Sequence, residues 1–186
     1  IANKLRLNRR ITELMIEKCF ACFTGRDDEF SINLSYGDIT EPETVAQILS
    51  AIETSGIGDR VIFEILESDG ITNYDDIRTF IEQVKPYGCR IAIDDFGTGY
   101  SNFSHLLSLN VDFIKIDGSL IRNLHEDQTA FLVTSGIVQF ARSLDIQTVA
   151  EFVHNEPVQA KVRELGIDFS QGEYVSMPVP APGSAD

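Results

Sequence analysis

The sequence predicts an α/β fold in which helices cover a parallel sheet. Short runs of branched and aromatic apolar residues alternate with longer stretches whose apolar residues recur at helical spacing, and the alternation continues along the chain. No glycine-rich, phosphate-cradling loop follows any of the short runs, which weakens the case for an open, nucleotide-binding sheet. We therefore expect a (β/α) barrel, formed by a single domain that spans residues 1–186.

Each element is predicted from its local pattern. Six short apolar runs are typical of buried strands, at residues 30–34, 61–66, 90–94, 113–116, 148–151 and 169–171. Amphipathic spacing predicts helices near residues 5–23, 42–54, 77–84, 105–108, 137–144 and 155–165. The second helix should begin at a capping box of Thr40 and Glu43, and Gly166 should end the last one.

The composition restricts the classes of partner. A formal net charge of −14 argues against a partner of duplex nucleic acid, because such binding depends on Lys and Arg. Acidic clusters can still take a small phosphorylated ligand once they hold divalent cations. No apolar run is long enough to span a bilayer. We expect no membrane contact by this segment and a cytoplasmic location, although an anchor elsewhere in the protein stays open.

The three cysteines do not make a disulfide framework and fit a reducing compartment. Cys19 and Cys22 form a C-x-x-C pair within the first predicted helix, with no second pair and no histidine nearby to complete a zinc site. We expect both to be buried helix residues rather than a redox or metal pair.

Polar residues gather where the predicted strands end, which is where the chemistry of α/β barrels lies. They are Asn33, Glu64, Asp94, Asp95, Lys115, Glu151 and Gln171. Taken singly, several have plain explanations: Asn33 could cap a turn, Lys115 could lie on an exposed edge and Gln171 could begin a loop. Glu64 is harder to explain in this way, because alternation places it on the same face as apolar neighbours, and a buried carboxylate needs a cation or donor as partner.

Asp94 and Asp95 are followed at once by a turn that contains two glycines. Adjacent carboxylates repel one another and a cation would relieve the repulsion, although Asp and Gly also make ordinary turns. Oxygen donors from several strands fit Mg²⁺ or Mn²⁺ better than zinc. Two such ions could hold the attacking water and the leaving oxygen of a phosphodiester, with Lys115 steadying the water or the developing charge. The three histidines lie in or beside predicted helices, and none has an obvious paired nucleophile.

The ordered motifs resemble those of the EAL-domain family of bacterial cyclic di-GMP phosphodiesterases, from about residue 11 to residue 178. The matched motifs are Asn33-Leu34-Ser35, Glu64-Ile65-Leu66-Glu67, the octapeptide from Asp94 to Ser101, Lys115-Ile116-Asp117, Ala150-Glu151-Phe152-Val153-His154 and Gln171-Gly172, with Pro178 downstream. The resemblance implies a TIM-like barrel that hydrolyses one phosphodiester of cyclic di-GMP to give linear pGpG, using two Mg²⁺ or Mn²⁺ ions.

The resemblance also assigns roles by position. The implied metal ligands are Asn33, Glu64, Asp94 and Asp95. Lys115 would hold or polarise the catalytic water, and Glu151 and Gln171 would complete the metal and water network. Glu67 would brace the loop after Asp95, which in the family links the site to the dimer contact. A homodimer is implied, as is a fused sensor or diguanylate cyclase-type domain in the full-length protein.

The chain departs from the family pattern in four places. The Glu-Ala-Leu motif that names the family, whose glutamate is a metal ligand, should precede Asn33 by more residues than the chain contains. Either the chain was cut after that strand or the protein lacks the motif. We expect a segment of a longer protein, a barrel incomplete at its N-terminus and a flexible tail at residues 179–186. Leu66 replaces the usual threonine, and Glu173 stands where an aromatic is common. Phe152 and His154 replace the glycine and the second glutamate of the family's A-E-G-V-E.

Two other functions stay open. A catalytically inactive receptor for cyclic di-GMP is suggested by the absent glutamate and by the altered motif around Glu151. The other is a Schiff-base enzyme with Lys115 as its amine nucleophile, which is disfavoured because the surrounding carboxylates would keep that amine protonated.

Overall fold

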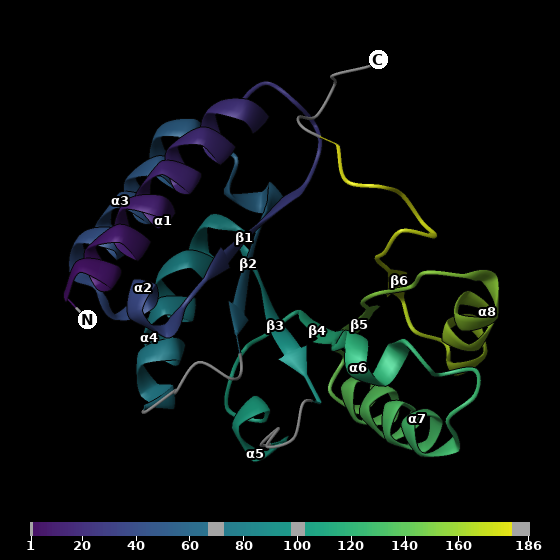
Figure 1. Ribbon diagram of the computed structural model, residues 1–186. Coiled ribbons are helices and arrows are strands. Elements are labelled where there is room, and N and C mark those ends of the chain that lie inside the picture. The colour runs from purple at the N-terminus through teal and green to yellow at the C-terminus, as the bar shows by residue number, and fades with distance from the viewer. Residues whose placement is uncertain (1, 67–72, 98–102, 180–186) are drawn as a thin grey trace. The chain divides into compact units, whose positions relative to one another are not determined.

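The computed structural model describes residues 2–66, 73–97 and 103–179, and the chain divides into two compact units (Figure 1). Unit 1 comprises residues 1–94 and 102–112, and unit 2 comprises residues 95–101 and 113–186. Each unit contains parallel strands and the helices that connect them. The expected single domain stays a prediction.

Unit 1 is built on the parallel strands β1 (Phe30–Leu34), β2 (Val61–Leu66) and β3 (Arg90–Phe96), the last two residues of β3 belonging to unit 2. Its helices are α1 (Ala2–Phe23), α2 (Tyr36–Thr40), α3 (Pro42–Ser55), α4 (Tyr74–Val84) and α5 (Phe103–Leu106), with 3-10 turns at Gly58–Arg60 and Lys85–Tyr87. Helices α1 and α3 lie side by side (Figure 1).

The core of unit 1 lies against the apolar face of its strands. Ile32, Phe63 and Ile91 pair in register across β1, β2 and β3, and all three are fully buried. Phe63 also packs edge to face against Phe80 of α4, with ring centroids 5.6 Å apart. Because successive side chains of a strand point to opposite faces, every second residue is turned away from this core.

Unit 2 contains the parallel strands β4 (Phe113–Ile116), β5 (Gln147–Ala150) and β6 (Phe169–Ser170). Its helices are α6 (Gly118–Ile121), α7 (Gln128–Ser143) and α8 (Glu156–Leu165). The Asn155 side chain caps α8 by accepting a hydrogen bond from the Val158 amide at 2.9 Å, and Gly166 ends the helix in the left-handed conformation, as the sequence predicts.

The strands agree closely with their predicted ranges, with small differences at the carboxyl ends. β5 ends at Ala150 and β6 at Ser170, so Glu151 and Gln171 lie directly after their strands. β3 instead continues through Asp95 and Phe96. Glu67, the Thr98–Ser101 part of the octapeptide and residues 180–186 lie outside the described residues.

The helix α3 begins where the sequence predicts, but its predicted capping box is wrong. Thr40 is the last residue of α2, and its hydroxyl donates to the Tyr36 carbonyl at 3.0 Å, so it does not take the extended conformation of an N-cap. The N-cap of α3 is Glu41, which makes no side-chain capping bond. The capping box lies one helix earlier, between Ser35 and Asp38.

The predicted burial of the C-x-x-C pair is also wrong. Both cysteines lie on α1 as expected, but Cys22 is exposed and Cys19 is partly exposed. The reason is the helix face: Ile16 and Phe20, one turn apart, take the positions that face the core. Among the described residues, no helix has the length and apolarity that a bilayer crossing needs.

Candidate functional site

Three polar side chains of unit 1 share one face of its strands. Asn33 on β1 and Glu64 on β2 are partners in the parallel register. Asp94 on β3 pairs with Leu66, one step closer to the carboxyl ends of the strands. Alternation places all three side chains on the face opposite the buried Ile32, at the end of the strands where α/β barrels carry their chemistry.

Two of these three groups are carboxylates that water scarcely reaches. Glu64 is 7% exposed and Asp94 is 8% exposed, whereas Asn33 is exposed. A buried carboxylate is costly unless hydrogen bonds or a cation compensate for its lost hydration. Both carboxylates have interactions within the protein, and a bound cation would add to that compensation.

In unit 2, a buried lysine forms an ion pair at the ends of the strands. Lys115 on β4 is 5% exposed, and its Nζ lies 2.9 Å from Glu151 Oε1. The Glu151 amide donates to the Ile116 carbonyl at 3.2 Å, and the Gln171 amide donates to the Ala150 carbonyl at 2.8 Å. These two bonds continue the strand pairing past β5 and β6, so that alternation puts Glu151 and Gln171 on the face of Lys115.

Asp95 has an unusual backbone conformation at the point where the chain passes from unit 1 to unit 2. Its φ is +56°, in the left-handed region that only a small share of non-glycine residues adopt and that Asp tolerates better than most. The turn interrupts the alternation of β3. Within unit 2, a carboxylate oxygen of Asp95 lies within 4.8 Å of one of Glu151.

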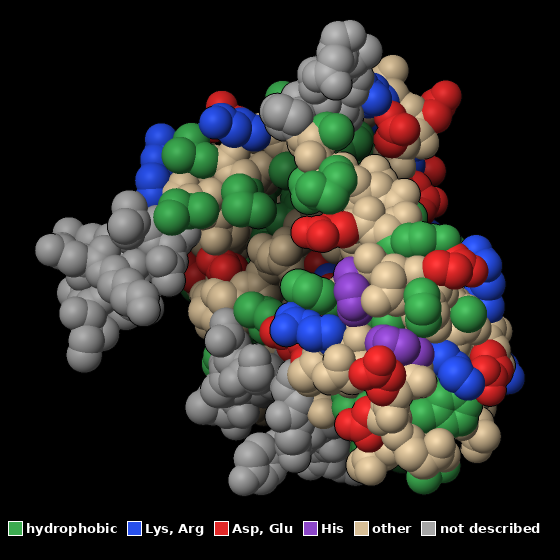
Figure 2. All heavy atoms as spheres, turned by 45° about the vertical axis from the view of Figure 1, so that its right-hand side comes forward, with side chains coloured by type: hydrophobic (Ala, Val, Ile, Leu, Met, Phe, Trp, Pro, Cys, Tyr) green, Lys and Arg blue, Asp and Glu red, His purple; other side chains and the backbone are tan. Residues whose placement is uncertain are grey.

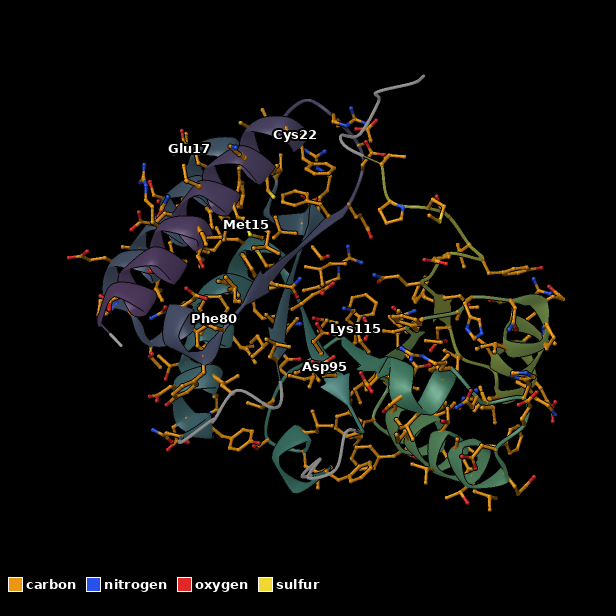
Figure 3. The ribbon with its side chains drawn as sticks, in the orientation of Figure 1. Met15, Glu17, Cys22, Phe80, Asp95 and Lys115 are labelled. Carbon is orange, nitrogen blue, oxygen red and sulfur yellow. The ribbon has the colours of Figure 1, made fainter. Side chains whose placement is uncertain are left out.

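The acidic group fits a hard divalent cation. Asp95 and Lys115, labelled in Figure 3, are both neighbours of Glu151, whose carboxylate pairs with the Lys115 ammonium. Like charges this close favour the binding of a cation. The donors are carboxylate oxygens, which suit Mg²⁺, Mn²⁺ or Ca²⁺ and not a site selective for zinc.

A hydrogen-bond network holds the loop that follows Glu151. His154 Nδ1 lies 3.2 Å from the Phe152 carbonyl oxygen, which can only accept, so Nδ1 carries the proton. His154 Nε2 then accepts from the Asn155 side-chain amide at 2.9 Å, while the amide oxygen of Asn155 caps α8 through Val158. The departure from the family motif at His154 thus carries a structural role that the sequence did not reveal.

One further side chain near the site escaped the sequence analysis. The guanidinium carbon of Arg122, which follows α6, lies 4.4 Å from the centre of the Phe152 ring. The only signal in the sequence was Phe152, an aromatic residue that stands where the family usually has a glycine. The sequence does not show which side chain this ring contacts.

Comparisons with known proteins identify the family of the chain. The EAL domain family matches residues 1–178. The chain is 37% identical over 154 residues to the cyclic di-GMP phosphodiesterase PdeF of Escherichia coli K12, an alignment that covers 81% of this chain and 20% of PdeF. The chain thus spans about a fifth of the length of that curated relative.

Solved structures give the same result for the fold. The c-di-GMP complex of the PaMucR phosphodiesterase matches with a TM-score of 0.83 and 28% identity, over 97% of this chain and 74% of that one. A manganese and cyclic di-GMP complex of Klebsiella pneumoniae BlrP1 matches with a TM-score of 0.80 and 29% identity, over 88% of this chain and 43% of that one. The predicted class, an α/β fold of the TIM-like barrel type, is confirmed.

Proposed function

The chain belongs to the EAL domain family, and we propose that it hydrolyses one phosphodiester bond of cyclic di-GMP to give linear pGpG. The observation that carries this proposal is the cluster of Asp95, Lys115 and Glu151, in which two carboxylates and a buried ammonium meet at the strand ends. Such a cluster can bind a cation and also keep a positive charge beside a reacting phosphate.

We propose that Asn33, Glu64, Asp94 and Asp95 hold two ions of Mg²⁺ or Mn²⁺. All four supply oxygen donors, and the manganese in the BlrP1 complex supports this choice of metal. Divalent ions at such a site lower the pKa of bound water and stabilise the attacking and leaving oxygens of a phosphodiester. The absence of histidine and cysteine from the proposed ligand set argues against zinc.

The remaining residues would bind and orient the reacting groups. The Lys115 ammonium is held by Glu151 and so points along a fixed direction, where it would hold the attacking water or the developing negative charge. Glu151 and Gln171, which follow neighbouring strands, would complete the network around that water. Glu67 would brace the loop after Asp95.

The test is incubation of the full protein with cyclic di-GMP and Mn²⁺ or Mg²⁺, with chromatography of the nucleotides. We expect linear pGpG, its loss on chelation, and loss of at least about a hundredfold in kcat for Lys115→Ala and Asp95→Asn. Lys85→Ala is the matched control, because Lys85 also forms an ion pair, with Asp112 at 2.6 Å, but takes no part in the proposed site.

Two outcomes would contradict the proposal in different ways. Binding of cyclic di-GMP without product, by a folded and metal-loaded protein, would identify a receptor instead of an enzyme. Neither binding nor product would reject cyclic di-GMP as the ligand. We also propose a homodimer, a fused sensor or cyclase-type domain of the kind found in the bifunctional relative MucR, and a cytoplasmic location. Sedimentation would test the dimer.

A further inference from the structure

Phe152, the residue directly after Glu151, occupies a position that is unfavourable on two counts. Its φ is +60°, a conformation that suits glycine and strains a bulky residue. Its side chain is also 55% exposed, so burial in a core does not compensate for the strain. A strained and exposed aromatic beside a candidate active site indicates a functional role.

The surroundings of Phe152 make room for its ring. Gly118, the first residue of α6, has no side chain, and a Cβ there would lie 2.8 Å from Phe152 Cβ and 3.2 Å from two ring carbons. Glycine weakens a helix and is not required at this position by a positive φ. Its presence therefore fits the need to seat the Phe152 ring against α6.

A planar cation completes the arrangement. The Arg122 guanidinium lies 4.4 Å from the centre of the Phe152 ring, in the range of a cation–π contact, and both side chains are exposed. His154 Nδ1 lies 3.2 Å from the Phe152 carbonyl oxygen, and the Asn155 side chain bonds the same imidazole. The result is a contact between a ring and a guanidinium, one residue away from Glu151.

We propose that Phe152 and Arg122 form a stacking platform for a purine base of the dinucleotide substrate. This inference rests on the proposed function and adds to it a binding contact. Purine bases stack on aromatic rings and on guanidinium planes, and Arg122 adds a positive charge that favours a phosphorylated ligand. On the face drawn in Figure 2, Lys and Arg side chains lie in small separate groups and not in one broad patch, which fits local recognition of a small ligand.

The platform binds the base and takes no part in the bond cleavage. Loss of the ring should therefore raise KM for cyclic di-GMP and the Kd for linear pGpG, while kcat changes little. For Phe152→Gly we expect an increase of about 5- to 100-fold in both constants, the usual range for one base stacked on an aromatic. Phe152→Tyr, which keeps the ring, should stay within about threefold of the original protein.

The experiment measures KM and kcat with cyclic di-GMP and metal, and the Kd of linear pGpG by calorimetry without metal, in the full chain. Phe152→Gly should fold at least as well as the original protein, because glycine relieves the strain at φ +60°. Phe152→Leu tests the ring alone: it keeps an apolar side chain but should lose as much affinity as the glycine variant. Gly118→Ala, which displaces the ring, should also raise KM for cyclic di-GMP and the Kd for linear pGpG.

Asp145→Gly is the matched control. Asp145 also has a positive φ, of +58°, but it precedes β5 whereas Phe152 follows it. Unchanged KM and Kd in Phe152→Gly, with the original protein active, would overturn the platform and leave the proposed function intact. The platform would also be overturned if Phe152→Leu bound cyclic di-GMP and linear pGpG as tightly as Phe152→Tyr. An original protein that neither binds nor hydrolyses cyclic di-GMP would reject the proposed function and the platform with it.

Discussion

Removal of the Lys115 ammonium tests what holds the acidic cluster of unit 2 together. Lys115 and Glu151 lie 2.9 Å apart, and their side chains are 7% and 18% exposed. At an effective dielectric constant of about 20, two unit charges at that separation attract by roughly 6 kcal/mol, and the desolvation of both groups cancels much of this. Removing one partner of a buried pair typically costs about 3–5 kcal/mol, because the other charge stays behind.

Lys115→Met keeps the length of the side chain and deletes the charge. Because Glu151 retains some contact with water, and can regain more, we expect a loss just below that range, about 2–3 kcal/mol, in the free energy of unfolding. The assay is urea unfolding without metal. Lys85→Met is the matched control: the Lys85–Asp112 pair is more exposed, at 21% and 28%, and its loss should cost about 1 kcal/mol.

The double variant Lys115→Met/Glu151→Gln decides whether the pair is the cause. Removing both charges should restore most of the stability, to within about 1 kcal/mol of the original protein, since no unpaired buried charge remains. Added Mn²⁺ should raise the free energy of unfolding of Lys115→Met more than that of the double variant, because the cation replaces the ammonium beside Asp95 and Glu151. A loss below about 0.5 kcal/mol in Lys115→Met, or a double variant less stable than the single one, would refute this reasoning.

Three further substitutions test the packing and the titration of the fold. Gly172→Ala should cost about 2–4 kcal/mol in urea unfolding, because its Cβ would lie 2.3 Å from the Val153 carbonyl oxygen; a loss below about 1 kcal/mol would contradict that contact. Phe80→Ala should cost about 3–5 kcal/mol through the cavity left beside Phe63, and an unchanged urea midpoint would show that the side chain is not in the core. Burial raises the pKa of Cys89 from 9.0 to about 12, so the folded protein keeps a proton that the unfolded chain releases. Stability should therefore fall between pH 9 and pH 12 more steeply than in Cys89→Ala, and parallel pH profiles would contradict the burial.

The sequence predicts the faces of the site because strand alternation is a strict geometric rule. Each expected strand is short and regular, so the period of two assigns Asn33 and Glu64 to one face, and the register then makes them neighbours. Lys115 and Glu151 follow in the same way in unit 2. Identification of these residues as metal ligands and catalytic groups depends on the family resemblance, and the roles themselves stay predictions.

Local features that depend on tertiary contacts were not predictable in the same way. Thr40 and Glu43 have the spacing of a capping box, but the short helix α2 uses Thr40 as its last residue. A helix of five residues has too few positions to show a period, so the pattern gave no sign of it. Cys22 was expected to be buried because cysteine usually is, and the core-facing stripe of α1 passed through Phe20 instead.

The three described non-glycine residues with positive φ separate a routine use of that conformation from a functional one. Asp145 follows the end of α7, where a left-handed residue commonly ends a helix. Asp95 lies in the last part of β3 and Phe152 lies after β5, and neither position is the end of a helix. At both, the period of two is broken beside a carboxylate of the candidate site. Strain of about 1–2 kcal/mol at each is retained where it turns a side chain toward a position that a regular strand cannot reach. For Asp95 that side chain is a proposed metal ligand. By the same argument, the strained backbone at Phe152 is retained because it positions the aromatic ring.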